Sequence, residues 1–147
     1  MSSLSSLLPL LHLVGIVLAT GAATAKWVLL LRSRSDPVFL PIFLGAARPV
    51  TRLIILGQVL ATLTGIAWLV LGYALAPLLV AKLVLVGAVW VLGPVIDNVV
   101  EPRFRALAPE PGAAASPAFL AVQRRYLLLE TAATGIFYAI IVMWMLG

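Results

Sequence analysis

Residues 77–97 read PLLVAKLVLVGAVWVLGPVID, with Lys82 as the one charged side chain before Asp97 at the end. A helix that crosses the roughly 30 Å hydrocarbon layer of a bilayer needs about 20 mostly apolar residues, and this stretch meets that requirement. Three stretches of the same kind lie around it, at about 8–31, 52–73 and 122–146. The sequence therefore predicts an all-α fold, a polytopic membrane four-helix bundle.

The composition of the whole chain supports this prediction. Of 147 residues, 63% are hydrophobic and 10% are charged, which leaves too little polar surface to cover a soluble globule. We expect one transmembrane domain over residues 1–147, located in the cell membrane as a multi-pass protein in contact with the lipid bilayer. The chain has no cysteine, so it can form neither a disulfide framework nor a thiolate metal site.

The arginines indicate how the helices are oriented. They lie in or beside two expected loops, at 32–51 and 98–121, and the full set is Arg32, Arg34, Arg48, Arg52, Arg103, Arg105, Arg124 and Arg125. By the positive-inside rule both loops are expected to be cytoplasmic, which makes the protein N-out and C-out. Because the positive charge is confined to helix ends, it is explained by topology, and we expect no nucleic-acid partner.

Prolines set the expected helix boundaries. Pro37, Pro41 and Pro49 are expected to keep residues 36–49 out of a straight helix, with Phe39 to Leu44 lying at the headgroups. Residues 102–117 hold four prolines and Gly112 and are expected to form a flexible linker. Ser116 followed by Pro117 is typical of the start of the last helix.

Small residues hint at an internal repeat. Gly15 and Gly21 are six residues apart in the first segment, as are Gly87 and Gly93 in the third, and Thr64-Gly65 matches Thr134-Gly135 in the second and fourth. A parallel duplication of a helical hairpin is one explanation, and the general enrichment of small residues at membrane helix contacts is the other. Both predict that these glycines lie at helix contacts.

An inner polar cluster is expected near the cytoplasmic ends of the helices. Its members are Lys26, Gln58, Asp97 and Glu130, all within roughly two turns of those ends. An ion pair of Lys26 with Glu130 or Asp97 would offset the cost of placing charges in hydrocarbon. Snorkelling of Lys26 to the interface and a proton path or anionic-ligand site are the alternatives. No chain of titratable groups joins this layer to the opposite one, so a transmembrane proton relay is not expected.

A second group lies near the outer face. His12, Lys82, Met143 and Met145 are expected at similar depth, with the aromatic residues Trp68, Tyr73 and Trp144 around them. Haem b with His12 as axial ligand, and copper with His12 as metal ligand, are two interpretations of a site where Lys82 and a methionine complete the set. An interfacial histidine in an aromatic belt beside a snorkelling lysine is the third. We expect His12 and Lys82 to face the bundle interior.

Short motifs in the chain resemble a known superfamily. His12-Leu13-Val14-Gly15, the run that starts at Lys82, and Glu130-Thr131 after an arginine-rich helix entry are similar to the small bacterial membrane proteins that include HemJ and the CopD copper-resistance domain. The resemblance implies a bacterial inner membrane. It also implies that His12 and Lys82 occupy the histidine and lysine positions of HemJ-like proteins, which are haem-binding protoporphyrinogen oxidases. The further histidine of HemJ and the His- and Met-rich pattern of CopD are missing.

These observations lead to one expected function and two alternatives. We expect a non-catalytic subunit or scaffold of a membrane complex, with other membrane subunits or a second copy of the chain as partner. One alternative is a haem-dependent oxidoreductase acting on a tetrapyrrole or a quinone, and the other is a copper or small-ligand carrier. The sequence has no Ser/His/Asp set, phosphate-binding glycine loop or two-histidine zinc spacing, so hydrolase and kinase chemistry are excluded.

Overall fold

The computed structural model describes residues 2–72 and 74–146, with side chains from Leu7 onward. Over these residues the chain forms α1 (Ser2–Ser35), α2 (Phe39–Val70), α3 (Pro77–Val95), the π-helical turn η1 (Ile96–Val100), α4 (Glu101–Ala106) and α5 (Pro117–Met145). The described residues contain helices and no strand, which confirms the all-α four-helix bundle.

The helices have the length and composition of membrane spans. In the described part of the chain four helices are long and apolar enough to cross a bilayer, because α3, η1 and α4 run on as one helix over Pro77–Ala106. Their 29 to 32 residues exceed the roughly 20 that a hydrocarbon layer needs, so their ends extend into the headgroup regions. The chain is a multi-pass membrane protein.

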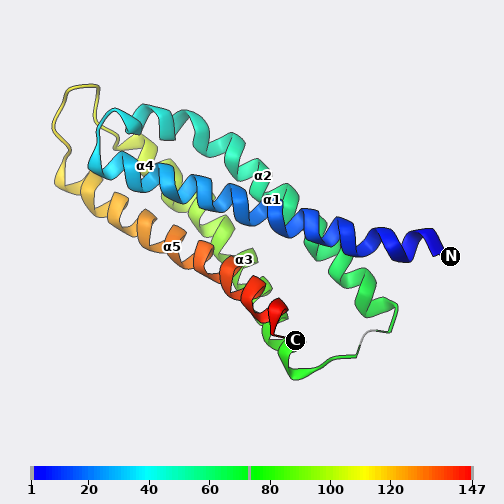
Figure 1. Cartoon of the computed structure of the whole chain (residues 1–147). Helices are drawn as coiled ribbons and strands as arrows, with labels where there is room; N and C mark the ends of the chain where they lie inside the picture. The colour runs from blue at the N-terminus through cyan, green and yellow to red at the C-terminus, as the bar shows by residue number, and fades with distance from the viewer. Residues whose placement is uncertain (1, 73, 147) are drawn as a thin grey trace.

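The four spans pack as two pairs. Figure 1 shows α1 beside α2 and α3 beside α5, with the N-terminus, the connection from α2 to α3 and the C-terminus at the same end of the bundle. The α1–α2 contact is the most extensive one, and α1 also packs along α5. Contact between α2 and α3 is slight by comparison, so these two neighbouring helices are the least tightly packed pair of the bundle.

Two glycines bring the backbones of α1 and α2 together. A Cβ added to Gly15 would lie 2.7 Å from the Ala61 nitrogen, and one added to Gly57 would lie 2.5 Å from the Ala19 nitrogen. No real side chain fits at such distances, so this crossing requires glycine at both positions. The expected contact role is confirmed for Gly15, and also for Gly65, where an added Cβ would lie 3.6 Å from the His12 ring. It is wrong for the other four glycines, where an added Cβ would meet nothing within 4 Å: Gly21, Gly87, Gly93 and Gly135.

A core of aromatic side chains lies at the end of the bundle opposite the two termini. Phe43 of α2, Phe104 of α4 and Tyr126 of α5 are fully buried and meet edge to face, with ring centroids 5.3 to 5.8 Å apart. Phe119 stacks on Phe104 with centroids 5.0 Å apart. Such aromatic pairs stabilise a core by more than the burial of their apolar surface alone would.

The first expected loop is much shorter than the sequence predicted. Helix α1 continues to Ser35 and α2 begins at Phe39, so residues 36–38 connect them. Pro41 lies in the first turn of α2, where its missing N–H is not needed, and Pro49 is accommodated inside the helix. Phe39 to Leu44 form the first turns of α2, and Phe43 packs in the aromatic core. Their depth at the headgroups stays a prediction.

The second expected loop is also shorter. The third span passes through the π-helical turn and ends at Ala106, so residues 107–116 connect it to α5. The expected helix start is confirmed, because the Phe119 backbone N–H donates to Ser116 Oγ at 3.1 Å. The prediction ended this span too early because the prolines from Pro102 onward suggested a linker, whereas Pro102 is accommodated in the first turn of α4.

Candidate functional site

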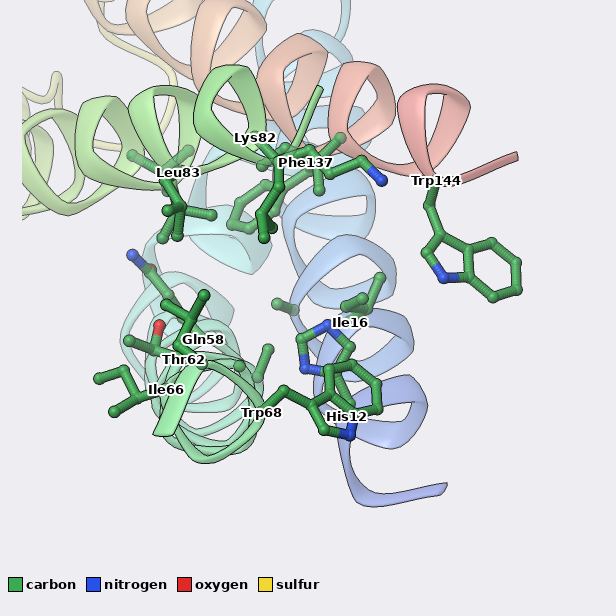
Figure 2. Close-up of a pocket in the computed structure, with 18 residues that line it drawn as sticks. His12, Ile16, Gln58, Thr62, Ile66, Trp68, Lys82, Leu83, Phe137 and Trp144 are labelled. Atoms are coloured by element: carbon green, nitrogen blue, oxygen red, sulfur yellow. The ribbon is translucent and has the colours of Figure 1, made fainter. Parts of the chain in front are cut away.

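A cavity of about 320 Å³ lies between the two helix pairs. All four spans contribute to its wall, which is mostly apolar, and Figure 2 shows its lining with His12 on α1 and Lys82 on α3 facing it from different sides. We call it the first cavity. The prediction that His12 and Lys82 face the bundle interior is confirmed.

The His12 ring is held in one orientation. His12 Nδ1 lies 2.8 Å from Thr64 Oγ1, and the Thr64 hydroxyl in turn reaches the carbonyl oxygens of Leu60 and Ala61 at 2.8 and 3.0 Å. Because the single hydroxyl proton is directed to the backbone, we assign the proton of the His12–Thr64 hydrogen bond to Nδ1. The neutral ring then keeps a lone pair on Nε2. The Trp68 ring, with its centroid 4.8 Å from that of His12, covers the imidazole.

Lys82 brings a positive charge to the same cavity. Its side chain is half-buried, and no carboxylate oxygen in the described part of the chain lies within 4 Å of its ammonium. It lies within two turns of the start of α3 at Pro77. A cation there costs less than one at the bilayer centre, but an anion beside it would still be stabilising.

The structure separates the other expected members of this group. Trp68 and Trp144 line the first cavity, whereas Met143 and Met145 are not among its lining residues, and Met145 is 75% exposed. Tyr73 lies outside the described residues. Among the residues described, no three His, Asp or Glu side chains are placed to hold a metal ion together. A site in this cavity therefore has His12 and Lys82 as its titratable groups, without a methionine.

The inner polar cluster forms around Lys26. Lys26 is 2% exposed, and its Nζ lies 3.1 Å from Asp97 Oδ1 and 2.7 Å from Glu130 Oε1. The contact to Asp97 is a hydrogen bond, while the contact to Glu130 is a close charge pair whose angle falls outside hydrogen-bond geometry. The predicted ion pairs of Lys26 with Glu130 and Asp97 are thus both present.

The sequence interpretation missed two members of this cluster. Glu101 Oε2 lies 3.7 Å from Lys26 Nζ and accepts a hydrogen bond from the Tyr126 hydroxyl at 3.1 Å. Arg105 donates to Glu101 Oε1 through Nε at 2.9 Å and Nη2 at 2.8 Å, and to the Leu44 carbonyl at 2.7 Å. The four-residue spacing of Glu101 and Arg105 is the signal that could have revealed them on a continuous helix. We call Lys26, Asp97, Glu101, Arg105 and Glu130 the ionic cluster.

A second cavity, of about 240 Å³, adjoins the ionic cluster. Lys26, Asp97 and Glu130 line it, together with Gln58 of α2. Gln58 also lines the first cavity, and its buried Nε2 has no hydrogen-bond partner among the described residues. The side chain of Gln58 therefore lies between the two cavities, one lined by His12 and Lys82 and the other by members of the ionic cluster.

Comparison with known proteins adds no relative. No family model, curated protein or solved structure matches the chain. The resemblance to the HemJ and CopD superfamily remains a prediction.

Proposed function

We propose that this membrane protein binds a small molecule with an apolar body and a carboxylate in the first cavity. The observation that carries the proposal is the pairing of an apolar cavity of about 320 Å³ with a half-buried Lys82 that has no carboxylate partner in the described structure. Apolar walls with a few convergent polar groups are the usual composition of a small-molecule site. A ligand carboxylate supplies the anion that Lys82 lacks.

The line between α2 and α3 provides a route for such a ligand. These two helices contact each other little, and the hydrogen bond from Trp90 Nε1 to Thr62 Oγ1, 3.1 Å long, links them. Apolar side chains line the cavity on both sides of this line, including Ile66 of α2 and Leu83 of α3. A lipophilic acid already dissolved in the bilayer would enter sideways, with its chain among these residues and its carboxylate at Lys82.

Haem b is a second candidate, and the state of His12 favours it. An imidazole whose Nδ1–H is held by a hydrogen bond presents Nε2 as a metal ligand in a fixed direction. Lys82 would pair with a propionate. His12 is the residue that would hold the haem iron, since neither Met143 nor Met145 lines the cavity. Bound haem would supply one-electron redox chemistry, while the protein residues would bind and orient it.

Binding of decanoate, with decanol as its uncharged counterpart, tests the proposal. We expect the purified protein in lipid nanodiscs to bind decanoate more tightly than decanol. Replacing Lys82 with methionine should weaken decanoate binding about tenfold or more, because it removes a hydrogen bond to a charged group worth about 1.5–3 kcal/mol. Lys82→Arg should restore most of the affinity, and decanol binding should change little in either variant.

Two results would decide against this function. Equal affinity for decanoate and decanol would show that no cation recognises the ligand. Saturable haem binding with a Soret band that His12→Ala abolishes, together with no decanoate binding, would select haem b. If neither compound binds, the expected subunit role remains, with the open Cβ positions at Gly21 and Gly87 available to a partner helix.

A further inference from the structure

The charges of the ionic cluster do not balance. Glu101 is matched by Arg105, whose Nε and Nη2 both donate to Oε1, and the Tyr126 hydroxyl satisfies the second oxygen of Glu101. This pair is neutral as a unit. The remaining members are Lys26, Asp97 and Glu130, one ammonium between two carboxylates.

Among the described residues, no other charged group on the surrounding helices forms an ion pair with Asp97 or Glu130. On α2, the side chains that line the second cavity with Asp97 and Glu130 are neutral and include Thr51 and Gln58. Arg48 and Arg52 of the same helix are exposed and form no ion pair in the described structure. With both carboxylates ionised, the group of Lys26, Asp97 and Glu130 therefore has a charge of −1, while Lys26 and Glu130 are 2% and 3% exposed and the Asp97 side chain is 25% exposed.

A carboxylate without a compensating cation in such a largely buried group is unfavourable, so the group takes up a proton or holds a second cation. Lys26 Nζ already lies between the two carboxylates, where a cation would sit. The described residues also offer no set of three acidic or histidine ligands for a metal ion. Protonation is the simpler way to neutrality, because it needs no further ligands.

We propose that Asp97 and Glu130 share one exchangeable proton at neutral pH and form a proton-binding site beside the second cavity. The proton comes from water, and its uptake converts one carboxylate into a neutral carboxylic acid without any redox step. The second cavity provides the contact with water, because Gln58 Nε2 and Thr51 Oγ1 are buried in its lining without a hydrogen-bond partner in the described structure. Polar atoms of this kind bind internal water. The site does not depend on what the first cavity binds.

Infrared spectroscopy of the full chain in nanodiscs tests this proposal. The chain has only five Asp and Glu side chains, so the C=O stretch of a protonated carboxyl can be assigned by substitution. We expect one such band per chain at pH 7, shifting in D₂O. It should vanish in both Asp97→Asn and Glu130→Gln, because each change leaves one carboxylate to pair with the one ammonium of Lys26. Glu110→Gln, in the exposed connection before α5, should keep the band.

Two results of the infrared experiment would contradict the shared proton. Absence of the band in the wild-type protein at pH 7 would overturn the proposal. Survival of the band in either folded variant would also overturn it, because the proton would then not belong to the shared pair. Circular dichroism and size-exclusion chromatography establish folding, and Asp97→Asn provides the second variant if Glu130→Gln, at the more buried position, does not fold.

Discussion

Replacing Gly57 with alanine should destabilise the protein by about 1–3 kcal/mol, the range for overpacked cores. The added Cβ would lie 2.5 Å from the Ala19 nitrogen and 2.6 Å from the Gly15 oxygen, both backbone atoms that cannot turn aside. Helices α1 and α2 would have to separate along the contact that joins this helix pair. Unfolding by increasing SDS in mixed micelles, followed by circular dichroism, measures the change in free energy of unfolding.

Gly21→Ala is the matched control for this experiment. It is the same change inside α1, but an added Cβ there meets nothing within 4 Å. Alanine is favoured over glycine in a helix by up to about 1 kcal/mol, so this variant should be as stable as the wild type or more stable. Equal stabilities of the two variants would show that the close approach of α1 and α2 is absent.

Replacing Arg105 with alanine should cost about 3–5 kcal/mol, because it leaves the buried carboxylate of Glu101 without its cation. Glu101 is 4% exposed and would lose both of its hydrogen bonds from the guanidinium. The bond from Arg105 to the Leu44 carbonyl, which joins α4 to α2, would also be lost. The same SDS titration measures the effect.

Arg103→Ala is the control for the charge itself. Arg103 lies two residues earlier in α4, is exposed, and forms no ion pair within the described residues. Exposed charges contribute little to stability, so we expect the free energy of unfolding to change by less than about 1 kcal/mol. A similar loss of stability in both variants would mean that net charge at this end of the helix, and not the bond to Glu101, is what matters.

The sequence predicts the spans well because their main determinant is local. Apolar length marks a membrane helix without reference to its neighbours, as residues 77–97 do. The ion pairs of Lys26 were also predictable, since opposite charges at matched depth in adjacent helices attract. Pro49 misled the prediction, because the helix around it is stabilised by packing that only the folded chain provides.

The site was predictable only in part. His12 and Lys82 stand out as ionisable groups in apolar segments, and both line the first cavity. Thr64, which orients His12, gives no such signal, because a threonine bonded to its own helix looks the same in sequence as one that also contacts a neighbour. Met145 was included in the predicted site because of its depth in the membrane alone. Its position around the helix axis places its side chain on the exposed face of α5. The orientation of the bundle in the membrane remains a prediction.

Photolabelling with a decanoate that carries a diazirine on its chain tests the central claim most directly. If the first cavity binds the ligand, mass spectrometry should find the label on lining residues of α3 such as Leu79 and Val86, and excess decanoate should remove it while decanol does not. Val84 and Val91 of the same helix are each 66% exposed and serve as reporters of labelling from the bilayer. Labelling of these two positions as strong as that of the lining residues, and unchanged by decanoate, would contradict the proposed binding site.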